Sequence, residues 1–387
     1  MKGKNKMENN ETNVKPKNFC VRYIVLAIAM FFLGACGLYL LIYFYPDPFV
    51  KTITEEVINK NVTVTDTGIA DAVEKIYDAV VVVRTYSNQQ LYATGTGFVY
   101  KKDGDKAYIL TNNHVIESGD AIYVEFTDGS IVETKVEGKD SYSDIAVLSL
   151  SADEVLAVAE MGSSEDARVG DTVFTVGAPI NSDTYSGSVT RGIVSGKNRL
   201  VSVSTSNSST ADMMMSVLQT DAAINSGNSG GPLANANGEV IGITSLKLSS
   251  SGLSSGASIE GMGFAIPIET ALNYAEKLEK GETIKRPQLG ISMRNLAEAQ
   301  YYHYPTLNNI GVDYGVYVES VTSSSPADKG GIKTGDVIVA VDGKDVSDLA
   351  YLRYLLYNHS VGDTMNVRVY RDGDYKDLTI TLDQEAE

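Results

Sequence analysis

The chain has 387 residues, enough for two or three domains, and its 43% hydrophobic and 21% charged residues exclude a mainly disordered protein. Its formal net charge of -17 argues against a nucleic-acid partner, because binding phosphate requires a basic face. Both cysteines, Cys20 and Cys36, lie near the N-terminus, so the rest of the sequence contains no disulfide and no thiol nucleophile. The histidines are scattered and form no Cys/His cluster, so we expect no metal site.

The N-terminal segment predicts a basic tail followed by a transmembrane helix. Residues 1–22 hold six Lys or Arg against two Glu, and residues 23–45 carry no charge. As a helix, 23–45 would span roughly 30 Å of hydrocarbon, and the basic tail would stay cytoplasmic, with the rest of the chain outside the cell membrane. The alternative is a cleaved lipoprotein signal acylated at Cys36. Because the apolar run continues past this cysteine, an uncleaved anchor is favoured.

Residues 46–68 are polar and contain two prolines, which predicts a linker. The sequence then alternates between short runs rich in β-branched residues and turn pairs such as Asp103-Gly104, which predict hairpins. The expected strands are 79–86, 97–100, 107–111, 121–126, 131–136, 145–150, 172–176 and 240–244. Many short strands favour an antiparallel barrel or sandwich. A helix over 270–280 is the first expected after the apolar segment.

A change in composition at Arg286-Pro287 predicts a second, smaller domain over 286–387. It contains an Asp-Gly turn at 342–343 and a helical pattern over 348–357. The expected strands are 315–321, 337–341, 365–370 and 378–382. This pattern is typical of a small barrel capped by helices.

The stretch N-S-G-N-S-G-G-P, residues 225–232, surrounds Ser229 with glycines. A flexible surface loop is one interpretation, because these are the usual turn residues. The other is a catalytic nucleophile, and serine then needs a histidine base oriented by a third group. Within 69–281 the sequence offers one histidine, His114, after an apolar strand, and Asp144 stands directly before another. Taken alone, each is as typical of an ordinary corner or turn residue. The amides of Gly227 and Ser229 are candidates for an oxyanion hole.

Three motifs, T-N-N-H-V at 111–115, S-D-I-A-V-L at 143–148 and G-N-S-G-G-P-L at 227–233, resemble the signatures of the HtrA/Deg family of serine proteases. The resemblance covers about residues 69–281 and implies a chymotrypsin-like double β-barrel, mainly β in class, that needs no cofactor. It implies that Ser229 is the nucleophile, His114 the base and Asp144 the group that orients it. It also implies a homotrimer and a strand that pairs with the substrate backbone through Ile243, Thr244 and Ser245.

The second domain resembles the PDZ module of the same family, a small α+β domain. Gln288-Leu289-Gly290-Ile291 is similar to its carboxylate-binding loop. Leu289, Gly290 and Ile291 are therefore expected to capture the C-terminus of a peptide.

Three departures limit the resemblance. Ser226 stands where many relatives have proline, residues 178–183 differ from the usual glycine-rich activation loop, and a Ser/Gly-rich stretch lengthens the loop after Leu248.

The sequence therefore predicts a single-pass, membrane-anchored serine endopeptidase that degrades misfolded or exposed proteins outside the cytoplasmic membrane, in protein quality control and stress response. Two other functions stay open: a regulatory protease that cleaves one specific site once its PDZ domain binds a peptide, and a non-enzymatic chaperone or scaffold.

Overall fold

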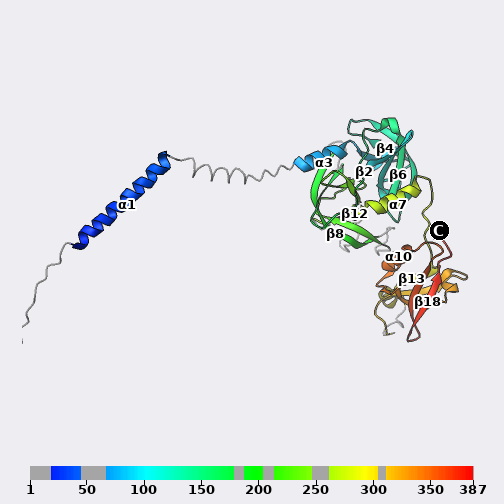
Figure 1. The fold of residues 1–387 in the computed structure, drawn as a ribbon. Helices are drawn as coiled ribbons and strands as arrows, with labels where there is room; N and C mark the ends of the chain where they lie inside the picture. Colours follow the sequence, from blue (N-terminus) through cyan, green and yellow to red (C-terminus); the bar gives the residue numbers. More distant parts are fainter. Residues whose placement is uncertain are drawn as a thin grey trace, which may run out of the picture. The chain divides into compact units, whose positions relative to one another are not determined.

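The computed structural model describes residues 19–44, 67–177, 187–203, 213–245, 261–303 and 311–386, and divides into two units, 1–65 and 66–387. Most of the predicted basic tail and linker, and the two loops that depart from the family pattern at 178–183 and after Leu248, lie outside the described residues. The first unit contains the helix α1 (Phe19–Phe44) (Figure 1). Its segment 22–41 is long and apolar enough to cross a membrane. A signal sequence near the N-terminus can have the same length and composition.

The second unit begins with a helix that the sequence analysis missed. Helix α3 (Thr67–Tyr77) precedes the first strand, so the helix predicted at 270–280 is not the first one after the apolar segment. Ala72 and Ile76, one turn apart on α3, are buried in the main hydrophobic core. Their spacing is the signal that could have revealed this helix, but only two turns carry it.

Six strands then close a first antiparallel barrel in the order β1-β2-β3-β6-β5-β4. They are β1 (Val80–Ser87), β2 (Gln90–Asp103), β3 (Lys106–Asn112), β4 (Ala121–Glu125), β5 (Ile131–Asp140) and β6 (Ile145–Ser151). The turn pair Asp103-Gly104 joins β2 to β3, as predicted. Both faces of β6 are buried, since Ala146 and Leu148 pack inside the barrel and Ile145 and Val147 pack in the core shared with the second barrel, which explains its mostly apolar sequence.

A second antiparallel barrel closes in the order β10-β11-β12-β9-β8-β7. Its strands are β7 (Thr172–Gly177), β8 (Ser188–Val203), β9 (Met213–Thr220), β10 (Pro232–Asn235), β11 (Val240–Thr244) and β12 (Gly263–Pro267). Helix α7 (Ile268–Leu278) follows, close to the predicted 270–280. The predicted chymotrypsin-like double barrel is therefore confirmed.

The main hydrophobic core lies between the two barrels and not inside either one. It joins Phe98 and Leu110 of the first barrel to Phe174 and Ile243 of the second, all fully buried. Each barrel also has its own interior cluster of Val, Ile and Leu. Burial of this shared core holds the two barrels together, so that loops from both meet at one place.

The C-terminal part forms a separate sheet in the order β13-β14-β15-β17-β18, with β16 (Lys344–Asp345) paired to β15. Its strands are β13 (Ile291–Asn295), β14 (Val316–Val321), β15 (Val337–Val341), β17 (Thr364–Arg371) and β18 (Asp374–Thr381). Helix α10 (Leu349–Tyr357) packs its buried Leu352, Leu355 and Leu356 into this sheet's core. The predicted small α+β domain is confirmed.

One buried carboxylate of the first barrel gives its stability a defined dependence on pH. The Oε atoms of Glu137 accept hydrogen bonds from Lys135 Nζ at 2.6 Å, Lys106 Nζ at 2.9 Å and Ser149 Oγ at 2.8 Å. The Lys135 bond, opposed by burial and reinforced by Lys106 and Ser149, lowers the pKa of Glu137 to about 2. An unfolded glutamate titrates near ~4.3, so this stabilisation is complete above that pH and is lost as the pH falls toward 2.

We therefore expect Glu137→Gln to lower the melting temperature at pH 7, and the difference from the parent protein to shrink steadily as the pH falls below about 4. Thermal unfolding followed by circular dichroism between pH 7 and pH 2.5 measures this difference. Glu133→Gln, an exposed position on the same strand, serves as the control and is expected to show no such trend. A Glu137→Gln difference that stays constant with pH would contradict the assignment.

Candidate active site

The three residues of the predicted triad are presented by three different connections. His114 lies on the short helix α4 (Asn113–Ile116), which follows β3 directly. Asp144 ends the turn between β5 and β6, and Ser229 lies in the loop between β9 and β10. The first two come from the first barrel and the third from the second barrel. The serine loop of the second barrel reaches the first barrel, where the Thr96 amide donates to the Ser229 carbonyl at 2.9 Å.

His114 and Asp144 form a close, directed pair. His114 Nδ1 lies 2.8 Å from Oδ2 and 3.0 Å from Oδ1 of Asp144, and the His114 amide donates to Oδ1 at 3.0 Å. The Asp144 side chain is 2% exposed, whereas that of His114 is 23% exposed. A buried carboxylate at Nδ1 fixes the imidazole tautomer that leaves Nε2 as the acceptor, so the accessible edge of the ring can act as a base.

The backbone around Asp144 is held in an unusual conformation. Its φ of 56° lies in the left-handed region, which a non-glycine residue rarely adopts. Two hydrogen bonds to the Asp144 carbonyl oxygen hold it there, from the Asn113 amide and from Asn112 Nδ2, both at 3.0 Å. Asn112 is fully buried. The side chain of Asn112 and the backbone amide of Asn113 thus hold Asp144 beside His114, a role for Asn112 that the sequence does not predict.

Ser245 completes the surroundings of the carboxylate. Its Oγ donates to Asp144 Oδ2 at 3.1 Å, and its side chain is fully buried. The family resemblance implies that Ser245 pairs with substrate through its backbone. The structure gives its side chain a further contact, which joins the second barrel to the aspartate. No sequence signal separates these two roles, because they depend on which way one side chain points at the end of β11.

The loop around Ser229 requires its glycines. Gly227 and Gly230 have φ values of 103° and 85°, where side chains are strained. A Cβ atom on Gly230 would lie 2.2 Å from the Thr96 carbonyl oxygen and 2.3 Å from Thr111 Oγ1. The Thr244 hydroxyl donates to the Asn228 carbonyl at 2.7 Å and so fixes the loop from below. The loop is a fixed element of the site and not a flexible turn.

Thr96 connects this loop to the first barrel. Its amide donates to the Ser229 carbonyl at 2.9 Å, and its Oγ1 donates to the Gly227 carbonyl at 2.6 Å. Thr96 itself is 1% exposed. Thr96 is not among the residues that the sequence predicts at the site. The structure shows that Thr96, between two glycines of the first barrel, binds the serine loop across the junction of the barrels.

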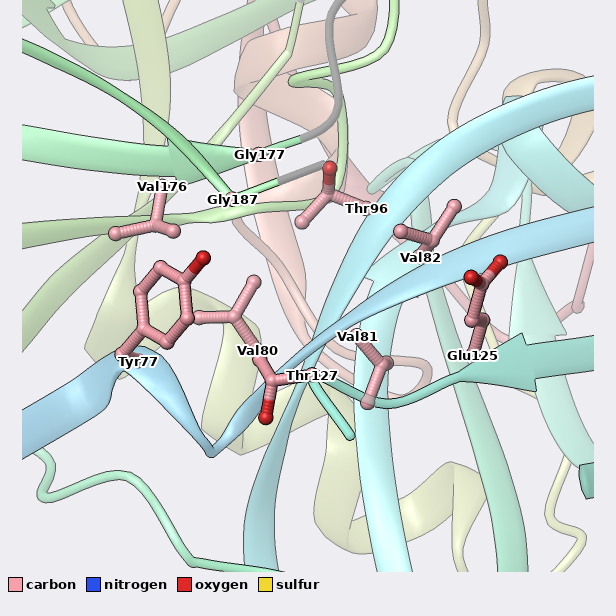
Figure 2. Close-up of a pocket in the computed structure, with 10 residues that line it drawn as sticks. All are labelled: Tyr77, Val80, Val81, Val82, Thr96, Glu125, Thr127, Val176, Gly177 and Gly187. Atoms are coloured by element: carbon pink, nitrogen blue, oxygen red, sulfur yellow. The ribbon is translucent and has the colours of Figure 1, made fainter. Parts of the chain in front are cut away.

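Figure 2 shows this junction, with Thr96 of the first barrel near Gly177 of the second, and with Tyr77 and Val80 beside Val176. The cavity between them has a volume of about 10 Å³. A space of that size holds roughly one water molecule. This region is therefore a closely packed junction between the barrels and not a ligand site.

The expected role of Ile243 and Thr244 in pairing with substrate needs correction. Strand β11 lies between β10 and β12, so Ile243 is paired on one side with Pro232 and on the other with Ile266. Thr244 donates its amide to the Gly231 carbonyl and accepts the Gly230 amide at its own carbonyl. Because both edges of the strand are already used here, an incoming peptide has no strand edge to join at Ile243 and Thr244.

The expected carboxylate-binding loop of the second domain lies directly before its edge strand. The Leu289 carbonyl accepts the Ala327 amide at 3.0 Å, and the Gly290 carbonyl accepts the Thr322 amide at 2.9 Å. Ile291 begins β13, which in the described part of the chain pairs with β14 alone. Its other edge faces α10, whose Leu349 amide donates to Asn295 Oδ1 at 2.7 Å. An edge strand beside a helix is the arrangement that accepts an extended peptide.

Among the described residues, no three His, Cys, Asp or Glu side chains lie together as a metal site requires. The chemistry available to the site is that of its own side chains: a serine hydroxyl, an imidazole with a defined tautomer and a buried carboxylate. In this combination, a serine attached to a glycine-rich loop can be activated for attack on a carbonyl carbon.

Comparison with known proteins agrees with this chemistry. Residues 95–243 match the trypsin-like peptidase domain, and residues 287–382 match the PDZ domain. The chain is 41% identical over 339 residues to the serine protease Do-like HtrA of Bacillus subtilis (strain 168), covering 82% of this chain and 73% of that protein. It is 44% identical over 297 residues to the serine protease Do-like HtrA of Lactobacillus helveticus, covering 76% and 69%.

Solved structures show the same likeness. The serine endoprotease from Yersinia pestis is similar with a TM-score of 0.60 and 30% sequence identity, over 82% of this chain and 98% of that one. The HtrA-type protease AlgW with a decapeptide is similar with a TM-score of 0.59 and 28% identity, over 81% and 97%. Both matches extend over the two barrels and the C-terminal sheet together.

The surroundings of Asp144 lead to a graded prediction for activity. Asp144→Asn presents an amide N–H to His114 and favours the wrong tautomer, so we expect kcat to fall roughly 10⁴-fold. Ser245→Ala removes one hydrogen bond to the carboxylate and is expected to lower kcat about tenfold. Hydrolysis of a chromogenic peptide at pH 8 measures both.

The matched control for Ser245→Ala is Ser149→Ala, which also removes a buried hydroxyl bound to a carboxylate, but away from the site. Its kcat is expected to equal that of the parent protein. If Ser245→Ala and Ser149→Ala lower kcat equally, Ser245 has no particular link to the aspartate.

Proposed function

The chain belongs to the HtrA family of serine proteases, and on this premise we propose that it cuts peptide bonds with Ser229 as nucleophile, His114 as general base and Asp144 as the group that orients the histidine. The observation that carries the assignment is the pairing of His114 Nδ1 with the buried Asp144 carboxylate at 2.8 Å. With Nδ1 engaged, Nε2 is left to accept the proton of the attacking hydroxyl.

In the proposed reaction, Ser229 Oγ forms a bond to the carbonyl carbon of the scissile peptide while its proton passes to His114. The resulting oxyanion is stabilised by the backbone amides of Gly227 and Ser229. His114 then gives the proton to the leaving amine, and the C–N bond breaks to leave an acyl-enzyme on Ser229. Water, activated by the same histidine, hydrolyses this ester and restores the serine. Asp144 stays ionised and stabilises the imidazolium in both steps.

The substrates that we propose are unfolded or misfolded proteins, as part of protein quality control and stress response. Unfolded chains expose extended segments. Such segments can bind through main-chain hydrogen bonds, which depend little on sequence. We propose that the backbone of Ser245 pairs with such a segment, because Ile243 and Thr244 are already paired within the barrel.

We further propose that Leu289, Gly290 and Ile291 of the PDZ domain bind the C-terminal carboxylate of a peptide. Support comes from the open edge of β13 and from the adjacent α10, between which an extended peptide can add as a further strand. Peptide binding at this loop is the feature on which the alternative of a regulatory, site-specific protease depends.

The test of the proteolytic site compares the full chain, purified in detergent, with its Ser229→Ala variant on unfolded casein. We expect the parent protein to cleave casein at several positions and the variant to be at least about 10³-fold slower, because the nucleophile is absent. Equal cleavage by both would overturn the assignment of Ser229. Cleavage of one specific site in a membrane protein but not of casein would favour the regulatory alternative, and binding without cleavage by either would favour a chaperone.

We also propose that α1 is an uncleaved anchor, with the N-terminus cytoplasmic and both domains outside the cell membrane. The helix has the length and apolar composition to span, and the basic residues precede it. N-terminal sequencing of the mature protein from membranes is expected to begin before residue 19. A mature chain that begins at Cys36 would show the lipoprotein instead. Family membership favours a homotrimer, which sedimentation of the solubilised chain measures.

A further inference from the structure

A buried ion pair connects the segment between the two domains to the end of β5. Arg286 Nη1 donates to Asp140 Oδ1 at 2.7 Å, and Nη2 donates to Oδ2 at 2.8 Å, so the pair is bidentate. The two side chains are 14% and 9% exposed. Burial opposes ionisation of Asp140, but the hydrogen bonds and charge of Arg286 outweigh it and hold the pKa of Asp140 below its usual range. The loss of Arg286 would leave a buried charge uncompensated.

Three tyrosine rings surround the guanidinium of Arg286. Its Cζ lies 4.4 Å from the ring centroid of Tyr142, 5.6 Å from that of Tyr357 and 5.7 Å from that of Tyr274. The rings come from the β5–β6 turn, from α10 and from α7. The rings of Tyr142 and Tyr357 also meet edge to face at 4.7 Å. We call these three rings the tyrosine cage. It is complete only when α10 of the PDZ domain lies against the turn of the protease domain.

The backbone of Arg286 belongs to the PDZ domain although its side chain binds the protease domain. Its carbonyl oxygen accepts the Ala386 amide at 2.7 Å. Two residues further on, the Gln288 amide donates to the Gln384 carbonyl at 3.1 Å. These bonds tie the start of the domain to the C-terminal end of the chain. A movement of the PDZ domain would therefore move the guanidinium with it.

Asp140 in turn holds the turn that presents Asp144. Its Oδ2 accepts the Ser143 amide at 2.7 Å, directly before Asp144. The backbone of Asp144 is in the left-handed region, with φ of 56°, and such a conformation persists only where neighbouring contacts impose it. Contacts from Asn112 and Asn113 impose it on one side. The ion pair supplies the contact at the other end of the turn.

Packing does not replace the ion pair on this side of the turn. A cavity of about 160 Å³ lies between the domains, and its lining includes Tyr142 and Ser143 of the turn together with Tyr354 and Tyr357 of α10. Tyr142 packs against the main hydrophobic core on its other side, but toward this cavity the turn has no close-packed neighbours. The hydrogen bonds of Asp140 and the ring contacts of Tyr142 are thus the fixed points.

We propose that Arg286 is a positioning residue for the active site: bound to Asp140 within the tyrosine cage, it holds the turn that carries Asp144 in place only while the PDZ domain is seated. This inference rests on the proposed role of Asp144. It makes the orientation of His114 dependent on a contact that lies outside the three triad residues and comes from the segment joining the domains.

The test measures how fast a fluorophosphonate probe reacts with Ser229 in the full chain in detergent, since the rate constant and the fraction of sites that react are separate readouts. For Arg286→Gln and Asp140→Asn we expect the rate constant per reactive site to fall about ten- to a hundredfold, because a small misplacement of a catalytic group costs that much. The double variant is expected to be no slower than the slower single variant, because both act through one contact. Arg286→Lys, which keeps the charge, should recover part of the rate.

A matched control comes from the PDZ domain itself. Arg371 forms an equally buried bidentate pair with Asp336, bonded through Nε at 2.6 Å and Nη2 at 2.6 Å, away from the turn. Arg371→Gln is expected to lower stability without changing the labelling rate constant. Tyr357→Ala, which opens the cage from α10, is expected to slow labelling.

The outcomes separate this inference from the assignment of the nucleophile. If Arg286→Gln reduces only the fraction of sites that react, or if Arg371→Gln slows labelling as much, Arg286 has a structural role alone and the proposal is wrong. Additive effects of Arg286→Gln and Asp140→Asn would also overturn it. If Ser229→Ala still reacts with the probe at the parental rate, the proposed nucleophile fails, whatever the Arg286 variants do.

Discussion

The proposed active site depends on the hydrogen bonds that the buried carboxylate of Asp144 accepts. It accepts hydrogen bonds from the backbone and the ring of His114 and from Ser245, so that groups from both barrels converge on one charge. A charge taken out of water is costly unless it is fully paired, and this requirement leaves little freedom in the relative position of the barrels. In the proposed mechanism this carboxylate orients the base, and its hydrogen bond from Ser245 adds a polar contact between barrels that the shared hydrophobic core already holds together.

The serine loop is also held by contacts from both barrels. Its carbonyls at Gly227 and Ser229 are bound by Thr96 of the first barrel, and its centre is held by Thr244 of the second. Positive φ angles at Gly227 and Gly230 let the chain pass this crowded place. A loop that looks flexible by composition is thus held at several points. This rigidity matters because a nucleophile must be presented in one orientation.

The PDZ domain contributes more than a peptide-binding module joined by a linker. The segment that joins it to the protease domain carries Arg286, whose side chain enters the protease domain and whose backbone stays with the PDZ domain. The relatives and solved structures that resemble this chain extend over both parts together. We therefore propose that the junction between the domains regulates activity. It contacts the turn before Asp144 and not the nucleophile itself.

The sequence by itself determined the class of fold, the domain order and the chemistry. Short β-branched runs with Asp-Gly turns indicated the barrels, and one histidine within 69–281 left His114 as the available imidazole base. What the sequence could not show depends on the direction of side chains and on contacts between distant segments. The binding of Ser245 to Asp144, the pairing of both edges of β11 and the role of Thr96 follow from barrel closure. Arg286 and Asp140 are 146 positions apart, and their pairing exists only because two domains fold against each other. Local pattern encodes which elements form, whereas tertiary packing decides which polar groups must satisfy one another.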